Sequence, residues 1–127
     1  MKIITTSKYL RVSPKKAKIL VRSIKSLRPK DALERLNFMR DKAAFLLSKV
    51  IRSSLANATN NAKLNMDSLA FSTIEVGKGP FSKRWQPVSK GMAHQIKKRT
   101  THIKITLEEV KSQSSKVKII EKNKSLK

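Results

Sequence analysis

Residues 77–104 read GKGPFSKRWQPVSKGMAHQIKKRTTHIK, and the rest of the chain is organised around this stretch. No Asp or Glu occurs between Glu75 and Glu108. The eight cations of the stretch are Lys78, Lys83, Arg84, Lys90, Lys97, Lys98, Arg99 and Lys104. A basic segment with so few apolar residues cannot build a core, and compact domains seldom keep a long connection without a use for it. It predicts an arm that becomes ordered against a polyanion.

Strand-like segments flank this arm. Ile103, Ile105 and Leu107 alternate with polar residues, which is the period-two pattern of a half-buried strand. The run 69–76 is also strand-like, but its alternation changes phase, and a β-bulge near 72–73 would restore it. Two strands joined by the basic segment predict a stretched β-hairpin, with an arm at about 77–102.

The composition indicates one domain that binds a polyanion. Among 127 residues there are 30 Lys plus Arg and 8 Asp plus Glu, for a formal net charge of +22. Such a charge repels itself unless a polyanion neutralises it, so nucleic acid is the first candidate and an anionic membrane the second. The chain has no cysteine, which excludes disulfides and thiolate metal sites, and no run of 18 apolar residues that predicts a membrane span.

Three helices are expected before the arm, after a short strand at about 3–9. Ser13-Pro14 predicts the start of the first helix, with Ser as N-cap and Pro at the first helical position. Its apolar face comprises Ala17, Leu20, Val21, Ile24 and Leu27. Nearly opposite lie Lys15, Lys18, Arg22 and Lys25, with no acid among them. Like charges at these spacings destabilise a free helix, so we predict phosphate contact; an ordinary solvated face is the alternative.

The second helix is expected at about 30–38 and the third at about 41–60, with Asp41 as its N-cap. Asn60-Asn61 predicts the end of the third helix, because Asn tolerates the left-handed conformation there; a binding role for these asparagines is the alternative. A turn is expected at 65–68. After Val110 the chain is rich in Lys and Ser, which predicts a domain at 1–110 and a disordered basic tail at 111–127.

No enzyme site is visible in the sequence. His94 and His102 are the only histidines, and neither has a metal-ligand spacing to the other or to an acid. The segment 77–80 (GKGP) lacks the Lys-Ser/Thr ending of a P-loop, so we predict a structural turn. Trp85 lies between Arg84 and Gln86, far from any apolar pattern, and is predicted to stack on a base, a sugar or an Arg plane; folding back onto the arm is the alternative.

Four segments, in this order, resemble a known family. They are YLRVSPKK at 9–16, SLANATNN at 54–61, GPFSKR at 79–84 and IKKRTTHI at 96–103. The chain resembles the universal large-subunit ribosomal protein family L-twenty-two over about residues 5–107. The resemblance implies an α/β (α+β) fold, in which three helices pack on a small antiparallel sheet and a long β-hairpin protrudes.

The resemblance also implies a function and partners. In the family the domain sits near the exit of the peptide tunnel, and the hairpin threads through large-subunit (23S-type) rRNA. The tip lines the tunnel opposite ribosomal protein L-four, and members act early in subunit assembly. The implied partners are therefore rRNA, neighbouring ribosomal proteins and the nascent peptide, with no enzyme activity, no cofactor, no metal and no membrane.

We therefore predict a set of rRNA contacts and a tunnel-lining tip. The rRNA contacts are Arg11, Ser13, Lys15, Lys16, Lys18, Arg22, Lys25, Lys78, Lys83, Arg84, Trp85, Lys97, Lys98, Arg99 and His102. The tip runs from Trp85 to Met92, and its lining residues are Gln86, Pro87, Val88, Ser89, Lys90, Gly91 and Met92. Val88 and Met92 stand where the family commonly has arginine, so the contacts of those arginines do not carry over to this chain.

Two rival functions are compatible with the charge. One is a free architectural or regulatory nucleic-acid-binding protein whose arm enters a groove as a β-ribbon. The other is a membrane-active basic protein, although the apolar face of the first helix suits a protein core. The N-terminal residues 1–14 lack the features of a signal or transit peptide. The expected location is the cytoplasmic ribosome of a bacterium, or the ribosome of an organelle that encodes the protein.

Overall fold

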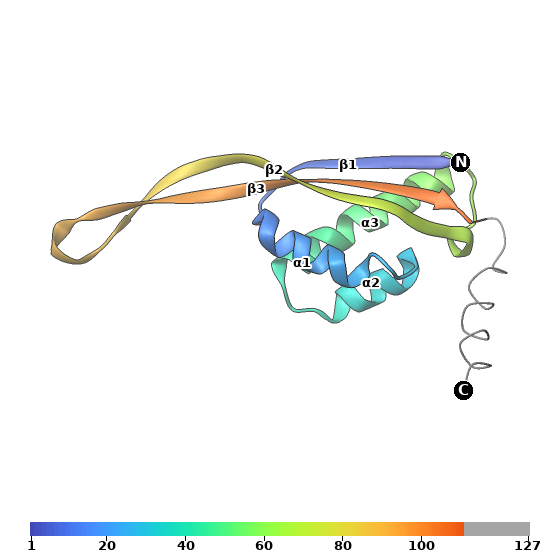
Figure 1. The fold of residues 1–127 in the computed structure, drawn as a ribbon, viewed down its shortest axis with the longest axis horizontal. Helices are drawn as coiled ribbons and strands as arrows, with labels where there is room; N and C mark the ends of the chain where they lie inside the picture. The colour runs from blue at the N-terminus through green and yellow to red at the C-terminus, as the bar shows by residue number, and fades with distance from the viewer. Residues whose placement is uncertain (111–127) are drawn as a thin grey trace, which may run out of the picture.

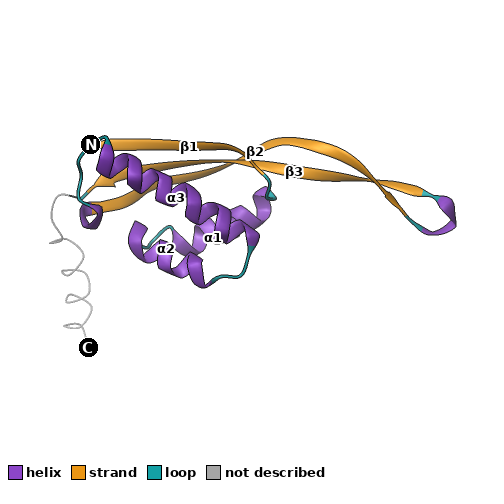
Figure 2. Ribbon diagram, turned by 180° about the vertical axis from the view of Figure 1, so that it is seen from behind, coloured by secondary structure: helices purple, strands orange, loops and turns teal. Residues whose placement is uncertain are grey.

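The computed structural model describes residues 1–110 of the chain. In chain order its elements are β1 (Lys2–Leu10), α1 (Pro14–Ile24), α2 (Pro29–Phe38), α3 (Lys42–Asn60), a short 3-10 helix η1 (Met66–Ser68), β2 (Leu69–Pro87), a second one η2 (Ser89–Gly91) and β3 (Ala93–Glu109). The predicted α+β class is confirmed. The three α-helices cover one face of an antiparallel sheet, and the distal halves of β2 and β3 project from it as a hairpin (Figures 1 and 2). The tail predicted at 111–127 lies outside the described residues.

The central strand of the sheet is β3, in the order β1-β3-β2. It pairs with β1 from the Lys2–Glu108 partners onward and with β2 from Leu69–Glu109 out to Pro87–Ala93. The expected alternation on β3 is confirmed, since every second residue from Thr101 to Leu107 is buried. Strands β2 and β3 therefore both belong to the domain and to the arm.

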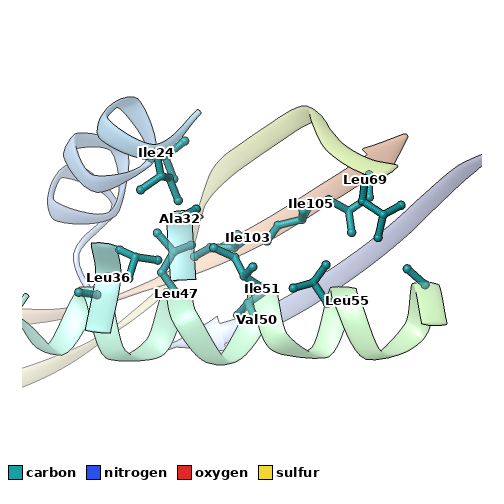
Figure 3. Close-up of a cluster of buried hydrophobic side chains, with 14 residues drawn as sticks. Ile24, Ala32, Leu36, Leu47, Val50, Ile51, Leu55, Leu69, Ile103 and Ile105 are labelled. Carbon is teal, nitrogen blue, oxygen red and sulfur yellow. The ribbon is translucent and has the colours of Figure 1, made fainter. Parts of the chain in front are cut away.

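The core lies between this sheet and the helices (Figure 3). An apolar stripe of α3 is buried, and helix α1 contributes Ala17, Val21 and Ile24, with Leu20 and Leu27 partly buried beside them. The stripe consists of Ala44, Leu47, Ile51, Leu55 and Ala58. The aliphatic face of α1 is thus occupied by the core, which removes the main argument for a membrane-active helix.

Two β-bulges bend strand β2. The register shift between Phe71 and Thr73 is the bulge predicted near 72–73, and it lets residues on both sides of it pack on the core. A second shift lies between Lys78 and Phe81, so the predicted turn at 77–80 is wrong and this segment is bulged strand. The reason is packing, because a Cβ on Gly79 would meet the side chains of the facing strand β3.

The helix ends follow the sequence signals in part. Asp41 accepts a hydrogen bond from the Ala43 N–H at 3.4 Å, so its N-cap role is confirmed. Ser13 has the extended N-cap backbone, but its hydroxyl makes no cap bond to α1. Helix α3 ends at the expected place, but Asn61 is right-handed (φ −90°) and the left-handed residue is Lys63 (φ 52°). The left-handed prediction at 60–61 is wrong because the Asn61 N–H still bonds backward within the last turn.

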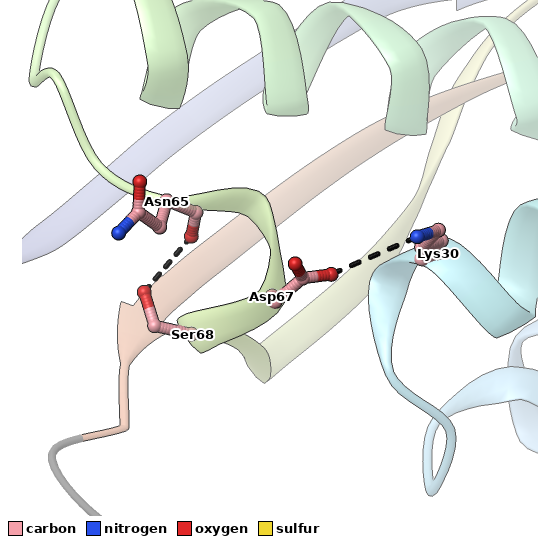
Figure 4. Close-up of polar contacts among 4 residues, drawn as sticks. All are labelled: Lys30, Asn65, Asp67 and Ser68. Carbon is pink, nitrogen blue, oxygen red and sulfur yellow. Dashed lines mark hydrogen bonds and ion pairs between the residues drawn. The ribbon is translucent and has the colours of Figure 1, made fainter.

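The predicted turn at 65–68 is the short helix η1, which connects α3 to β2 (Figure 4). The Ser68 hydroxyl donates to the Asn65 carbonyl at 2.8 Å, and Asp67 lies 3.7 Å from the Lys30 ammonium of α2. Both partners of this ion pair are largely exposed, so it stabilises the fold by at most about 1 kcal/mol.

The sheet face turned away from the helices carries paired charges. Lys2 lies 2.9 Å from Glu108, and Lys104 lies 3.6 Å from Glu75. Hydrogen bonds from the side chains of Lys2 and then Ser72 hold the pKa of Glu108 below its usual value. Glu75 and Glu108 are therefore already engaged by cations of the same sheet, which leaves these two acids unable to neutralise the arm.

We predict opposite outcomes for two buried hydroxyls. Among the described residues the Ser54 hydroxyl has no hydrogen-bond partner, whereas the Thr101 hydroxyl donates to the Val12 carbonyl. Ser54→Ala should leave the free energy of unfolding unchanged or raise it slightly, because no bond is lost. Thr101→Val should lower it by about 1–3 kcal/mol, because the buried carbonyl loses its donor. Chemical denaturation of the two variants tests this, and equal losses would contradict it.

Candidate nucleic-acid interface

The arm is strand-paired along its whole length, further than the sequence predicts. The sequence predicts strands at 69–76 and 102–107, whereas β2 continues to Pro87 and β3 starts at Ala93. Every residue from 81 to 95 is exposed, so neither face of the ribbon carries the apolar alternation by which a strand is recognised. The structure thus places both flanks of the expected polyanion-binding segment on a regular two-stranded ribbon.

The turn at the end of the arm is shorter than predicted. The ladder still pairs Trp85 with Gln95 and Pro87 with Ala93, so 85–87 belong to the strand and the loop is 88–92. The Val88 N–H donates to the Met92 carbonyl at 2.8 Å, and Lys90 (φ 59°) and Gly91 (φ 66°) make the left-handed turn between them. Val88 and Met92 therefore close the loop through their backbones, while their side chains stay exposed.

The ribbon has two unlike faces, because residues that lie opposite each other in a ladder share a face. We call one the aromatic face; its opposed pairs are Phe81 with Arg99, Lys83 with Lys97 and Trp85 with Gln95. On the second face the pairs are Ser82 with Lys98, Arg84 with Ile96 and Gln86 with His94. Rings and cations thus alternate on the aromatic face, which is a suitable platform for stacking on bases beside phosphates.

Two rings of the aromatic face are available to a ligand. The Lys97 ammonium lies 4.9 Å from the centre of the Phe81 ring, in a cation–π contact. Phe81 is 47% exposed and Trp85 is 69% exposed. So much exposed surface argues against the alternative that Trp85 folds back onto the arm. Phe81 was not among the predicted contacts. Its spacing of two residues from Lys83 and four from Trp85 places the three side chains on the same face of a strand, and this spacing could have identified it.

Like charges face each other on the arm when no ligand is bound. Lys83 lies directly opposite Lys97 in the ladder, and like charges in that position destabilise a hairpin. Within residues 1–110, Lys104 is the one cation of 77–104 that has an ion-pair partner, Glu75. A polyanion along the ribbon would remove this repulsion, whereas the protein's own acids do not.

The cations of α1 form a second basic surface. Lys15, Lys16, Lys18, Arg22 and Lys25 are all exposed, on the side of the helix that faces away from the core. The exposed side chain of Ile19 lies within this surface, which the sequence analysis did not anticipate. Helix α1 is the helix next to the base of the arm (Figures 1 and 2), and Val76 of β2 packs on the same small cluster as Ala17. The structure therefore brings the two predicted basic regions together.

The remaining predicted residues lie where the arm meets the domain. Arg11 and Lys78 are exposed, whereas Ser13 and His102 are half-buried. The Nδ1 atom of His102 accepts a hydrogen bond from the Tyr9 N–H at 3.0 Å. Its predicted contact with RNA stays a prediction, but its observed contact is internal.

Other site chemistries find no support in the part of the chain that the structure describes. Residues 1–110 contain no group of three or more His, Cys, Asp or Glu side chains placed to hold a metal ion. No helix in the same range is long and apolar enough to cross a membrane.

Comparisons with known proteins place the chain in a family. The family model described as ribosomal protein L22p/L17e matches residues 5–108. A protein of Akkermansia muciniphila named large ribosomal subunit protein uL22 is 38% identical over 107 residues, which is 84% of this chain and 96% of that protein. Proteins of the same name are similar at 40% identity in Lawsonia intracellularis and 39% in Finegoldia magna, each over 81% of this chain and 92% of their own length.

The opposed cations on the arm give a prediction in which stability and binding change in opposite directions. Lys83→Glu should stabilise the free protein by roughly 0.2–1 kcal/mol, because it replaces repulsion from Lys97 with attraction. The same change should weaken RNA binding, because it removes a cation and adds an anion. Lys90→Glu is the matched control, since loop residue Lys90 has no ladder partner and should weaken binding without a gain in stability. Thermal unfolding and RNA titration measure both effects, and a destabilised Lys83→Glu protein would contradict the prediction.

Proposed function

The chain belongs to the ribosomal protein L22p/L17e family and is a structural, non-enzymatic constituent of the large ribosomal subunit, and from this premise we propose how it acts there. The domain binds large-subunit rRNA through the basic surface of α1 and supports subunit assembly. The arm enters the rRNA, and its tip lines the tunnel through which the nascent peptide leaves. Its partners include ribosomal protein L-four at the narrow part of the tunnel. The bacterial relatives support a place on cytoplasmic ribosomes of a bacterium.

The observation that supports this proposal is that most cations of the arm have no acid partner among the described residues. Seven of the eight cations in 77–104 have no acid partner among the described residues, and the ribbon that bears them is exposed on both faces. Phosphate groups can form ion pairs with these cations along the strand. The exposed aromatic rings between them can stack on unpaired bases. RNA contains both groups, and the folded interior of a large rRNA presents them around the arm rather than on one side of it.

The geometry supports a division of labour between anchor and tip. Strand residues advance by roughly 3.3 Å each, so about ten paired residues on each side carry the loop some 30–40 Å from the domain. Most of the positive charge lies on the ribbon and on α1, and the loop 88–92 contains one cation, Lys90. Binding energy is therefore expected from the ribbon and α1, and the shape of the tunnel wall from the loop.

Counterion release gives the first test of rRNA binding. Each phosphate contact contributes about 0.7–0.9 to the slope of log K against log salt. Replacing Lys97, Lys98 and Arg99 together by Gln should therefore flatten the slope by roughly 2–3, measured by RNA titration at several salt concentrations. Replacing three exposed cations outside the proposed interface, Lys2, Lys30 and Lys63, is the control and should change the slope less. An unchanged slope in the triple arm variant would mean that these side chains point into solvent.

A pair of variants in cells tests the division of labour. Excision of 86–88 should leave incorporation into the large subunit largely intact, because the cations of the ribbon remain. It should reshape the tunnel wall and so change the response to macrolides or the stalling of nascent peptides. Charge reversal at Lys15, Lys18, Arg22 and Lys25 should instead reduce incorporation and leave the tunnel of assembled subunits normal.

Both variants are scored for protein content of subunits purified through a high-salt wash and for the tunnel phenotype. The wash also separates the proposal from a free nucleic-acid-binding protein, which would not co-sediment with large subunits. If the excision abolishes incorporation while the helix reversal has no effect, the anchoring role of α1 is wrong. If neither change affects ribosomes, the proposed placement of arm and tip is wrong.

A further inference from the structure

The base of the arm is the level at which the sheet loses its third strand. Strand β1 ends at Leu10, and beyond it β2 and β3 continue as a two-stranded ribbon. Both ladders shift register at this level, between Ser7 and Leu10 on one side of β3 and between Lys78 and Phe81 on the other. Leu10 and Lys78 both pair with the same residue, Thr101. Two bulges at the point where the third strand ends would leave a flexible hinge if backbone pairing alone joined the arm to the domain.

Side chains bridge both gaps in pairing at this level. On the β1 side, Tyr9 has a left-handed backbone (φ 58°), an unfavourable conformation for an aromatic residue. Its N–H donates to Nδ1 of His102 at 3.0 Å, and the two rings meet edge to face with centroids 4.9 Å apart. The imidazole thus replaces the ladder bond that the bulge removes and compensates for the strained backbone.

On the β2 side, Gly79 packs closely against the same histidine at the second bulge. A Cβ on Gly79 would lie 3.2 Å from Cε1 of His102 and would overlap the Thr100 hydroxyl. That hydroxyl donates to the Pro80 carbonyl, across the second bulge. The side chain of His102 therefore contacts Tyr9 of β1 on one side and lies so close to Gly79 of β2 on the other that a Cβ there would crowd it.

We infer that Tyr9, Gly79, Thr100 and His102 form a locked joint that sets the direction of the arm relative to the domain. In this joint His102 is a positioning residue. The backbone N–H of Tyr9 is the donor in this contact, and Nδ1 of His102 is the acceptor. The rRNA contact of His102 stays a prediction, and the observed contact gives this residue an internal role. If the proposed function is correct, the joint delivers the loop to a defined place in the subunit before the arm meets RNA.

The free protein offers a direct measurement of the joint. The chain has no cysteine, so Ser89→Cys in the loop and Asn60→Cys at the end of α3 give two spin labels in an otherwise unlabelled protein. The distribution of distances between the labels should be narrow in the parent protein and clearly wider with His102→Ala. His102→Asn should keep it narrow, because the Asn carbonyl can accept from the Tyr9 N–H. The control is His94→Ala, which removes the other histidine, exposed on the arm, and should change nothing.

A glycine pair tests the other side of the joint and serves even if His102→Ala does not fold. Gly79→Ala should shift or widen the distribution, because its methyl group would overlap Thr100. Gly77→Ala should not, since a Cβ there makes only ordinary contacts of 3.8 Å with His102. Hydrogen exchange of the Tyr9 amide should become about five- to tenfold faster in His102→Ala, as expected for the loss of one hydrogen bond.

Three outcomes would overturn the inference. The first is a distribution as narrow in His102→Ala and Gly79→Ala as in the parent protein. The second is a distribution as wide in His102→Asn as in His102→Ala. The third is a salt slope for RNA binding that falls by about 1 in His102→Asn, which would identify a phosphate ligand. If the distance distribution widens in His102→Ala as expected but the parent protein never enters ribosomes, the proposed function is refuted and the inference about the joint still stands.

Discussion

Burial of every second residue from Thr101 to Leu107 on β3 is the constraint on which the other parts of the structure depend. Ile103, Ile105 and Leu107 point into the core beneath the helices, and β1 and β2 both pair with the strand that carries them. A slip of one residue would turn all three side chains to solvent, so the register of β3 is strongly fixed. Because the same strand continues to Ala93, burial in the domain also fixes which residues face each other in the exposed arm.

Electrostatics then separates the molecule into two regions. The outer face of the sheet keeps its acids paired with Lys2 and Lys104, while α1 and the ribbon carry cations without acids. Among the described residues the distal cations of the arm therefore have no acid partner, and the ladder places Lys83 opposite Lys97. A protein built in this way is suited to a partner that supplies phosphate on several sides, as we propose for rRNA.

The elements with a buried face were predicted well, and those without one were not. The helix of Lys42–Asn60 and the strand alternation at 103–107 follow from apolar periodicity, and the bulge at 72–73 follows from its interruption. The paired part of the arm has no such signal, because strand pairing there depends on register inherited from the domain. The segment 77–80 was misread as a turn because glycines serve both turns and close strand packing, and only the facing strand distinguishes the two.

The sequence by itself determined the class of fold, the basic segments and the family, since periodicity, charge and local motifs are properties of neighbouring residues. The tertiary structure alone decided which residues meet across the base of the arm. Tyr9, Gly79 and His102 are far apart in the chain, and no spacing rule relates them. They come together because three strands converge where β1 ends, and a contact of that kind depends on strand register and bulge position rather than on any local pattern.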